Sequence, residues 1–280
     1  MPLKLMYITN RSDVAAIAEK YGVDRIFVDM EFINKAERQG GLDSVQNHHT
    51  IEDVKAVRAS VKKADLLVRV NPIHDAMEDY PSSEEEIEAV IQAGADLVML
   101  PYFKTIEEIN RFLGIVKGRA RTMLLLETSE AVECLDQILQ MDGIDEIHIG
   151  INDLAICYHK KFMFELLSDG TVETLCRRMQ IAGKFYGFGG IASLGRGLVP
   201  AEMIIKEHYR LGSRMAILSR SFCNISKIDE LDAVEEIFYR GIREIRNLES
   251  ECASHLKYFS DNQKEMVRAV QSVVAILDKN

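Results

Sequence analysis

Residues 121–154 read RTMLLLETSEAVECLDQILQMDGIDEIHIGINDL, and they decide the fold. The stretch opens with an apolar run at 121–127, continues with a helical pattern at 129–141, and closes with a second apolar run at 146–150. Apolar runs this continuous are typical of strands that are covered on both faces, as in a parallel sheet. The stretch therefore predicts one unit of strand, helix and strand.

The same alternation extends over roughly 220 residues, as a barrel of eight β/α units requires. The sequence therefore predicts an α/β fold, a (β/α)8 TIM barrel. A doubly wound open sheet is the alternative, but it is expected to carry a glycine-rich turn after its first strand, where this chain reads TNRSD. The predicted strands cover residues 3–9, 25–30, 65–70, 97–101, 121–127, 146–150, 184–190 and 214–219, and the predicted helices cover 12–22, 50–64, 82–94, 105–118, 129–141, 153–181 and 199–212.

Residues that favour helix ends support these boundaries. Asp and Glu in the first turns suit the positive end of the helix dipole. Glycine favours the left-handed backbone that often follows a helix. The predicted N-caps are Ser12, Thr50, Ser82 and Thr105, and the predicted terminal glycines are Gly22, Gly94, Gly118, Gly143 and Gly212.

Two further helical patterns follow the last predicted strand, from about residue 229 to the end. The barrel needs only the first as its eighth helix, so we divide the chain into a barrel at 1–258 and an extra C-terminal helix at 259–280. The extension is part of the same domain or of a subunit interface. Its apolar stripe must be covered by the chain's own barrel or by another subunit; the stripe consists of Met266, Val267, Val270, Val273, Val274, Ile276 and Leu277.

Composition limits the partners. The net charge of the 280 residues is −10, which argues against a nucleic acid or an anionic membrane as a partner. No apolar run approaches the roughly 20 residues of a membrane span. The five cysteines show no paired spacing, and the first ten residues do not resemble a signal peptide. We expect a cytoplasmic protein that binds a small carboxylate substrate.

Charged side chains gather where the predicted strands end, the edge at which barrels of this kind carry their chemistry. Asp29 and Glu31 end the second strand, Arg69 the third and Glu127 the fifth, and Asp153 follows the sixth. Buried acids in such numbers either become protonated or hold a cation among them, and oxygen donors favour Mg²⁺ or Mn²⁺. The alternative is that each acid caps a helix or forms a salt bridge, and for Asp153 taken alone the two interpretations are balanced.

The stretch at 124–155 resembles the HpcH/HpaI aldolase and citrate lyase β-subunit family. The pair Glu127-Thr128 and the turn Gly150–Leu154 match two parts of its pattern, and VDMEF (28–32), VRVNP (68–72) and GADLVMLP (94–101) resemble three more. The resemblance implies a divalent metal, Mg²⁺ or Mn²⁺, held by Glu127 and Asp153. It also implies enolate chemistry in which Arg69 faces the reacting oxygen.

The resemblance also bears on the substrate and on assembly. Free backbone N–H groups at Gly150, Asn152 and Asp153, where a helix starts, would hold a substrate carboxylate, together with Arg69. Members of the family commonly assemble through C-terminal helices. We therefore expect a homo-oligomer in which the final helix takes part.

The chain departs from the aldolase branch where that branch places its acid–base residues. Phe32 stands in place of a histidine, Gln92 in place of an aspartate, and Leu125 in place of a glutamine. An inserted segment at 33–49 follows Phe32, and its His48 or His49 is a candidate base near neutral pH; a solvated loop histidine is the alternative for each.

Asp29 and Glu31 complete the candidate catalytic set. The glycine-rich loop at 186–197, with Arg196, either grips phosphate or only makes a tight turn. The resulting hypothesis is a metal-dependent carbon–carbon lyase of the aldolase type that acts on a 2-oxo acid or related carboxylic substrate through an enolate. The alternatives are an acyl-CoA lyase of the citrate-lyase-like branch and a non-catalytic barrel subunit that binds a small anionic ligand.

Overall fold

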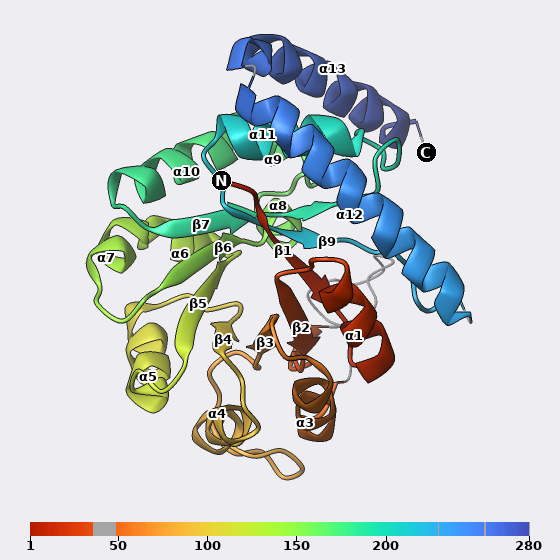
Figure 1. Cartoon of the computed structure of the whole chain (residues 1–280). Coiled ribbons are helices and arrows are strands. Elements are labelled where there is room, and N and C mark those ends of the chain that lie inside the picture. Colours follow the sequence, from red (N-terminus) through yellow and green to blue (C-terminus); the bar gives the residue numbers. More distant parts are fainter. Residues whose placement is uncertain (36–48, 229, 255, 280) are drawn as a thin grey trace.

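The fold was analysed in a computed structural model, which describes residues 1–35, 49–228, 230–254 and 256–279. Its centre is a parallel barrel with helices around it (Figure 1). The strands are β1 (Lys4–Ile8), β2 (Arg25–Asp29), β3 (Asp65–Arg69), β4 (Leu97–Leu100), β5 (Arg121–Leu126), β6 (Glu146–Ile149), β7 (Phe185–Phe188), β8 (Gly190–Ile191) and β9 (Met215–Leu218).

All eight predicted strands are present, and the seventh is interrupted. Its two parts, β7 and β8, are separated by Gly189, whose φ of +50° a side chain would rarely allow. The backbone N–H of Gly189 donates to Ile149 on one side, and its carbonyl accepts from Ile217 on the other. This strand therefore links β6 to β9 and brings the two ends of the sheet together, which confirms the predicted barrel.

Helix ends follow the expected chemistry at three of the four predicted N-caps. Thr50, Ser82 and Thr105 each close a capping box with the acid three residues later. The prediction for Ser12 is wrong: Ser12 is the first helical residue, and Arg11 occupies the N-cap without a side-chain bond. These helices are α1 (Ser12–Lys20), α3 (Ile51–Ser60), α4 (Ser83–Gln92) and α5 (Ile106–Val116).

Two of the predicted helices are broken into shorter ones. The pattern at 129–141 forms α6 (Ser129–Glu133) and α7 (Leu135–Gln140), and the pattern at 153–181 forms α8 (Ile151–Cys157), α9 (Glu165–Ser168) and α10 (Thr171–Ile181). Gly170, at a φ of +86°, separates the last two. As a result, α8 starts directly after β6 and its first turn lies at the rim of the barrel.

Side chains that point into the barrel form layers along its axis. At the end away from the rim, Arg25 forms a bidentate ion pair with Glu146, with both N–O distances at 2.6 Å. Above this pair lies an apolar layer, and the larger outer core lies between the strands and the helices. The apolar layer consists of Met6, Phe27, Leu67, Leu97, Met99, Met123, Leu125 and Met215.

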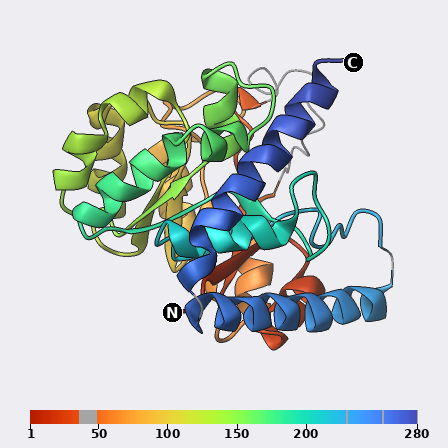
Figure 2. The same ribbon diagram turned by 90° about the horizontal axis from the view of Figure 1, so that it is seen from above.

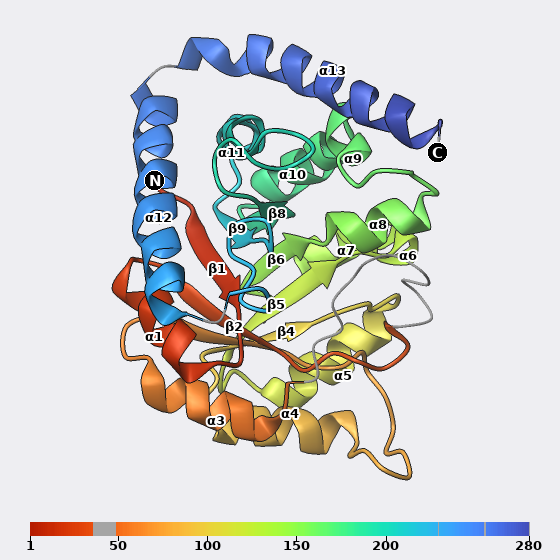
Figure 3. The ribbon, with the colours of Figure 1, turned by 90° about the vertical axis from the view of Figure 1, so that its right-hand side faces the viewer.

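The C-terminal helices cover one side of the barrel. The helix α12 (Leu231–Ser254) contacts α1 and α11 (Ala201–Arg210), and α13 (Phe259–Leu277) contacts α11 and α9 (Figures 2 and 3). Met266, Val270 and Val273 are buried against the chain's own helices, whereas Ile276 and Leu277 are exposed. Within the residues described, no helix has both the length and the apolar character needed to cross a membrane.

Candidate active site

A cavity of about 580 Å³ opens at the carboxyl ends of the strands. The expected residues Asp29, Arg69, Glu127 and Asp153 all line it, and so do Gly150, Asn152 and His49. Of the five charged residues predicted to gather at one rim, four therefore line the cavity, and Glu31 does not.

Arg69 is held by two carboxylates from the end of β2. Its Nε and Nη2 atoms donate to the two oxygens of Asp29, both at 2.7 Å, and its Nη1 lies 3.2 Å from Glu31. Asp29 and Arg69 line the cavity, whereas Glu31 does not. A guanidinium fixed by a bidentate pair has little freedom to turn, so Arg69 presents a defined face to the cavity.

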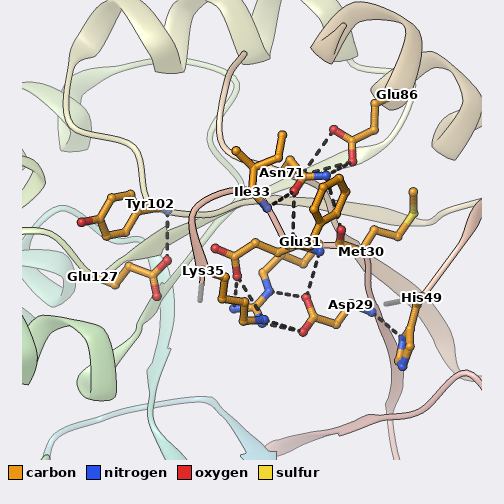
Figure 4. Close-up of polar contacts among 12 residues, drawn as sticks. Asp29, Met30, Glu31, Ile33, Lys35, His49, Asn71, Glu86, Tyr102 and Glu127 are labelled. Carbon is orange, nitrogen blue, oxygen red and sulfur yellow. Dashed lines mark hydrogen bonds and ion pairs between the residues drawn. The ribbon is translucent and has the colours of Figure 1, made fainter. Parts of the chain in front are cut away.

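Lys35 completes this cluster. Its ammonium lies 3.0 Å from Asp29 and 3.4 Å from Glu31, and the side chain is buried (Figure 4). Burial opposes the charge of Arg69, but the carboxylates of Asp29 and Glu31 outweigh it and raise the pKa of Arg69. Two cations and two acids thus balance one another at this side of the cavity.

Glu127 stands immediately after β5, with 3% of its surface exposed. Its Oε1 accepts a hydrogen bond from the backbone N–H of Tyr102 at 3.0 Å (Figure 4). The next residue, Thr128, caps α6 by accepting from the backbone N–H of Ala131. Since Thr128 caps the helix, Glu127 is not needed for that purpose, and its carboxylate is turned to the cavity.

Gly150 makes the close approach of Glu127 possible. A Cβ at this position would lie 2.6 Å from the Oε2 of Glu127 and 2.8 Å from its Cβ, which is too close for any ordinary contact. The turn after β6 therefore needs glycine, because the carboxylate occupies the space of a side chain.

Asp153 lies in the first turn of α8, with 7% of its surface exposed. Its Oδ1 is 3.4 Å from the side-chain amide of Asn152. The turn position agrees with the capping alternative, and the side chain also lines the cavity, as the metal interpretation requires.

The oxygen donors at this rim are of the kind that a divalent cation prefers. Asp29, Glu31, Glu127 and Asp153 bring four buried carboxylates together, and Arg69 and Lys35 contact the two that come from the end of β2. Within the described ranges, no group of three or more His, Cys, Asp and Glu side chains is placed to hold a metal by protein ligands alone. Mg²⁺ commonly takes one or two carboxylates and completes its shell with water or substrate oxygens, so Glu127 and Asp153 suffice.

His49 contacts the same cluster through its ring. Its Nδ1 accepts a hydrogen bond from the backbone N–H of Asp29 at 3.0 Å (Figure 4). Burial, the largest effect, lowers the pKa of His49. The bond assigns the neutral tautomer with the proton on Nε2, so His49 offers a donor rather than a base. His48 lies outside the described residues.

His148 is a cavity residue that the sequence analysis did not assign. It points into the barrel from β6, two residues before Gly150, and lines the cavity with 1% of its surface exposed. That spacing was the available signal, since residues two apart on a strand share a face.

Two other polar features at the strand ends lie away from the cavity. Asn71 accepts from the backbone N–H groups of Phe32 and Ile33 and donates to Glu86, so it shapes the loop after β2. Arg196, in the glycine-rich loop, is exposed and does not line the cavity, although Gly189 and Gly190 do.

Comparisons with known proteins identify the family. The model of the family described as HpcH/HpaI aldolase/citrate lyase matches residues 4–161, more than half of the chain. No curated protein matches. Solved structures that share the fold include the following two. An HpcH/HpaI aldolase/citrate lyase family protein from Burkholderia cenocepacia J2315 has a TM-score of 0.60 and 14% identity, with 84% of this chain and 95% of the other covered. An HpcH/HpaI aldolase from Desulfitobacterium hafniense DCB-2 has a TM-score of 0.58 and 15% identity, with 88% and 93% covered. The family match confirms the resemblance seen in the sequence: the chain belongs to the HpcH/HpaI aldolase/citrate lyase family, a family of lyases.

Proposed function

We propose that the protein is a divalent-metal-dependent carbon–carbon lyase that cleaves a 2-oxo acid through an enolate. The observation that carries the proposal is the meeting of two separate charged groups at one cavity. Glu127 and Asp153 supply oxygen ligands, and Arg69, fixed by Asp29, supplies a rigid cation. A barrel with a purely structural role has no need for both.

Arg69 stabilises the negative charge that develops on the ketone oxygen when the carbon–carbon bond breaks. Its contacts with Asp29 and Glu31 use three of its five N–H groups, and the remaining ones are available to a ligand. Because Asp29 and Glu31 hold the guanidinium before the substrate arrives, little reorganisation is needed during the reaction.

Glu127 and Asp153 would hold Mg²⁺ or Mn²⁺, which supplies Lewis-acid polarisation of the ketone when bound. The protein side chains do the positioning. Tyr102 orients Glu127 through its backbone N–H, and Asn152 lies beside Asp153. In this proposal the substrate carboxylate would lie at the start of α8, where backbone N–H groups of a first helical turn favour an anion.

His49 acts as a hydrogen-bond donor in this scheme. Its Nδ1 is occupied by the N–H of Asp29, so the Nε2–H is the group that remains for a substrate oxygen or an ordered water. The 4-hydroxyl group of the substrate loses its proton as it becomes the carbonyl of the product, and the acceptor of that proton must then be another group of the cavity or a water molecule.

Release of pyruvate or oxaloacetate from a panel of 4-hydroxy-2-oxo acids, with and without Mg²⁺ or Mn²⁺, tests the proposal. We expect turnover that depends on the metal and is lost in Glu127→Ala and Asp153→Ala. Asp136→Ala removes an exposed carboxylate on α7 as the matched control and should leave turnover unchanged. Unchanged metal affinity by calorimetry in both site variants would overturn the metal assignment, and absence of turnover across the panel would overturn the reaction.

A further inference from the structure

The inner end of the cavity is apolar except at one position. Five of the side chains that line it there come from β1, β2, β4, β5 and β9 and are hydrocarbon or thioether groups: Ile8, Phe27, Met99, Leu125 and Ile217. The sixth, from β6, is His148. Two levels of charge enclose this end, with Arg25 and Glu146 below and Arg69 and Asp29 above.

The ring of His148 is buried at the inner end of the cavity, with 1% of its surface exposed. Among the described residues, neither Nδ1 nor Nε2 has a hydrogen-bond partner of good geometry, and the backbone of Gly189 is a polar neighbour. A buried polar group without a partner costs free energy, so its retention needs a compensating contact. A position that faces a cavity can receive that contact from a ligand.

The ring is neutral throughout the physiological range. Burial lowers the pKa of His148 to about 3, and the charges of Arg25 and Arg69 act in the same direction. A neutral imidazole carries one donor nitrogen and one acceptor nitrogen. It can therefore bind a hydroxyl or a carbonyl oxygen, but it cannot balance the charge of a carboxylate.

We propose that His148 binds an uncharged oxygen of the substrate, a hydroxyl or a carbonyl, at the inner end of the cavity, and so helps to select which substrate is accepted. The assignment rests on the proposed lyase function. A carboxylate at this depth would lose its hydration among Ile8, Phe27 and Met99, whereas a hydroxyl or carbonyl needs only the single bond that the ring provides. His148 is a positioning and specificity residue in this proposal, and the bond-breaking step uses Arg69.

Two variants separate this role from a merely structural one. His148→Phe keeps a ring of similar size and removes both hydrogen-bonding atoms, and His148→Gln restores a donor and an acceptor. With the 4-hydroxy-2-oxo acid that the wild type cleaves best, we expect KM to rise about tenfold in His148→Phe, the effect of one ordinary hydrogen bond. We expect little change in kcat, and return of KM toward the wild-type value in His148→Gln.

A binding measurement that does not need turnover accompanies the kinetics. In protein labelled with ¹⁵N at histidine, the ring signal of His148, assigned by its loss in His148→Phe, should shift when pyruvate is added with Mg²⁺. His208→Phe serves as the matched control, because it removes another buried histidine that does not line the cavity, and it should leave KM unchanged.

The possible outcomes are distinct. If the wild type cleaves a substrate while His148→Phe keeps its KM and the ring signal stays in place, the His148 assignment is overturned and the lyase function stands. If KM rises equally in both His148 variants, the effect is structural and the assignment is again overturned. If the wild type neither cleaves any acid of the panel nor binds pyruvate, the proposed function fails and the assignment fails with it.

Discussion

Gly150→Ala is a test of the geometry that holds Glu127. The added Cβ would lie 2.6 Å from the carboxylate Oε2 and 2.8 Å from the Cβ of Glu127, whereas ordinary contacts begin near 3.4 Å. The two groups must therefore separate by about 0.8 Å at the oxygen and about 0.6 Å at the Cβ, the differences from 3.4 Å. Rotation of the carboxylate can relieve the first overlap, but the second requires the end of β5 or the turn after β6 to move.

Metal–ligand distances are held to about 0.2 Å, so a shift of this size should lower the affinity for Mg²⁺ and Mn²⁺ by roughly 10- to 100-fold. The backbone of Gly150, with φ at −79°, suits alanine, so the fold should be kept. Calorimetric titration with each metal measures the affinity, and circular dichroism and thermal unfolding check the fold.

Gly114→Ala is the matched control for this experiment. Gly114 is exposed in α5, and a Cβ there would meet nothing within 4 Å. The control should bind metal as the wild type does and should be slightly more stable, since alanine favours a helix over glycine. Wild-type affinity in Gly150→Ala would refute the reasoning, because Glu127 would then be displaced without consequence for the metal.

Three further predictions concern Arg69, the buried residue His208 and the assembly of subunits. Arg69→Lys should lower kcat by about 10²-fold in the lyase assay, because an ammonium cannot make the bidentate contact with Asp29; a rise in KM alone would make Arg69 a simple binding group. Burial lowers the pKa of His208 to about 3, so the unfolded chain binds a proton below about pH 6.5 that the folded chain does not, and stability should fall as the pH drops. Between pH 7 and 4.5, the free energy of unfolding measured by chemical denaturation should fall by about 2 kcal/mol less in His208→Phe than in the wild type. An equal fall in the two proteins would contradict the prediction. Light scattering should give a mass above 31.7 kDa for the full chain and a smaller assembly after deletion of 260–280; a full-length monomer would leave α13 as an intramolecular cover only.

The arrangement of strands could be predicted from the sequence because each strand is covered on both faces. A strand that is buried on both faces has apolar residues at nearly every position, and all eight predicted runs form strands in the structure. Helix continuity was harder to predict, since the break after α8 depends on backbone conformation. His159 and Gly170 both have positive φ, and of the two only the glycine is a sequence signal for a break.

The candidate site could be predicted in part for a similar reason. Strand ends of a parallel barrel meet at one rim, so Asp29, Arg69 and Glu127 follow from their positions on strands alone. The roles of Lys35 and His49 could not be predicted in this way. Lys35 lies in the turn that follows β2, and from there it contacts Asp29 and Glu31. His49 is the last residue of the inserted segment at 33–49, and it contacts the backbone of Asp29.

The structure also shows which residues stand near the place of the acid–base pair that the aldolase branch has and this chain lacks. Phe32 packs edge-on against Tyr80, away from the charged cluster, so it does not replace a histidine in the cavity. His49 enters the cavity from the following segment instead, but its bond with Asp29 makes it a donor. The inner end of the cavity carries His148, which is neutral at physiological pH. The two histidines among the described cavity residues are thus suited to binding uncharged oxygens, which favours a substrate that presents a hydroxyl or carbonyl oxygen to the inner end of the cavity.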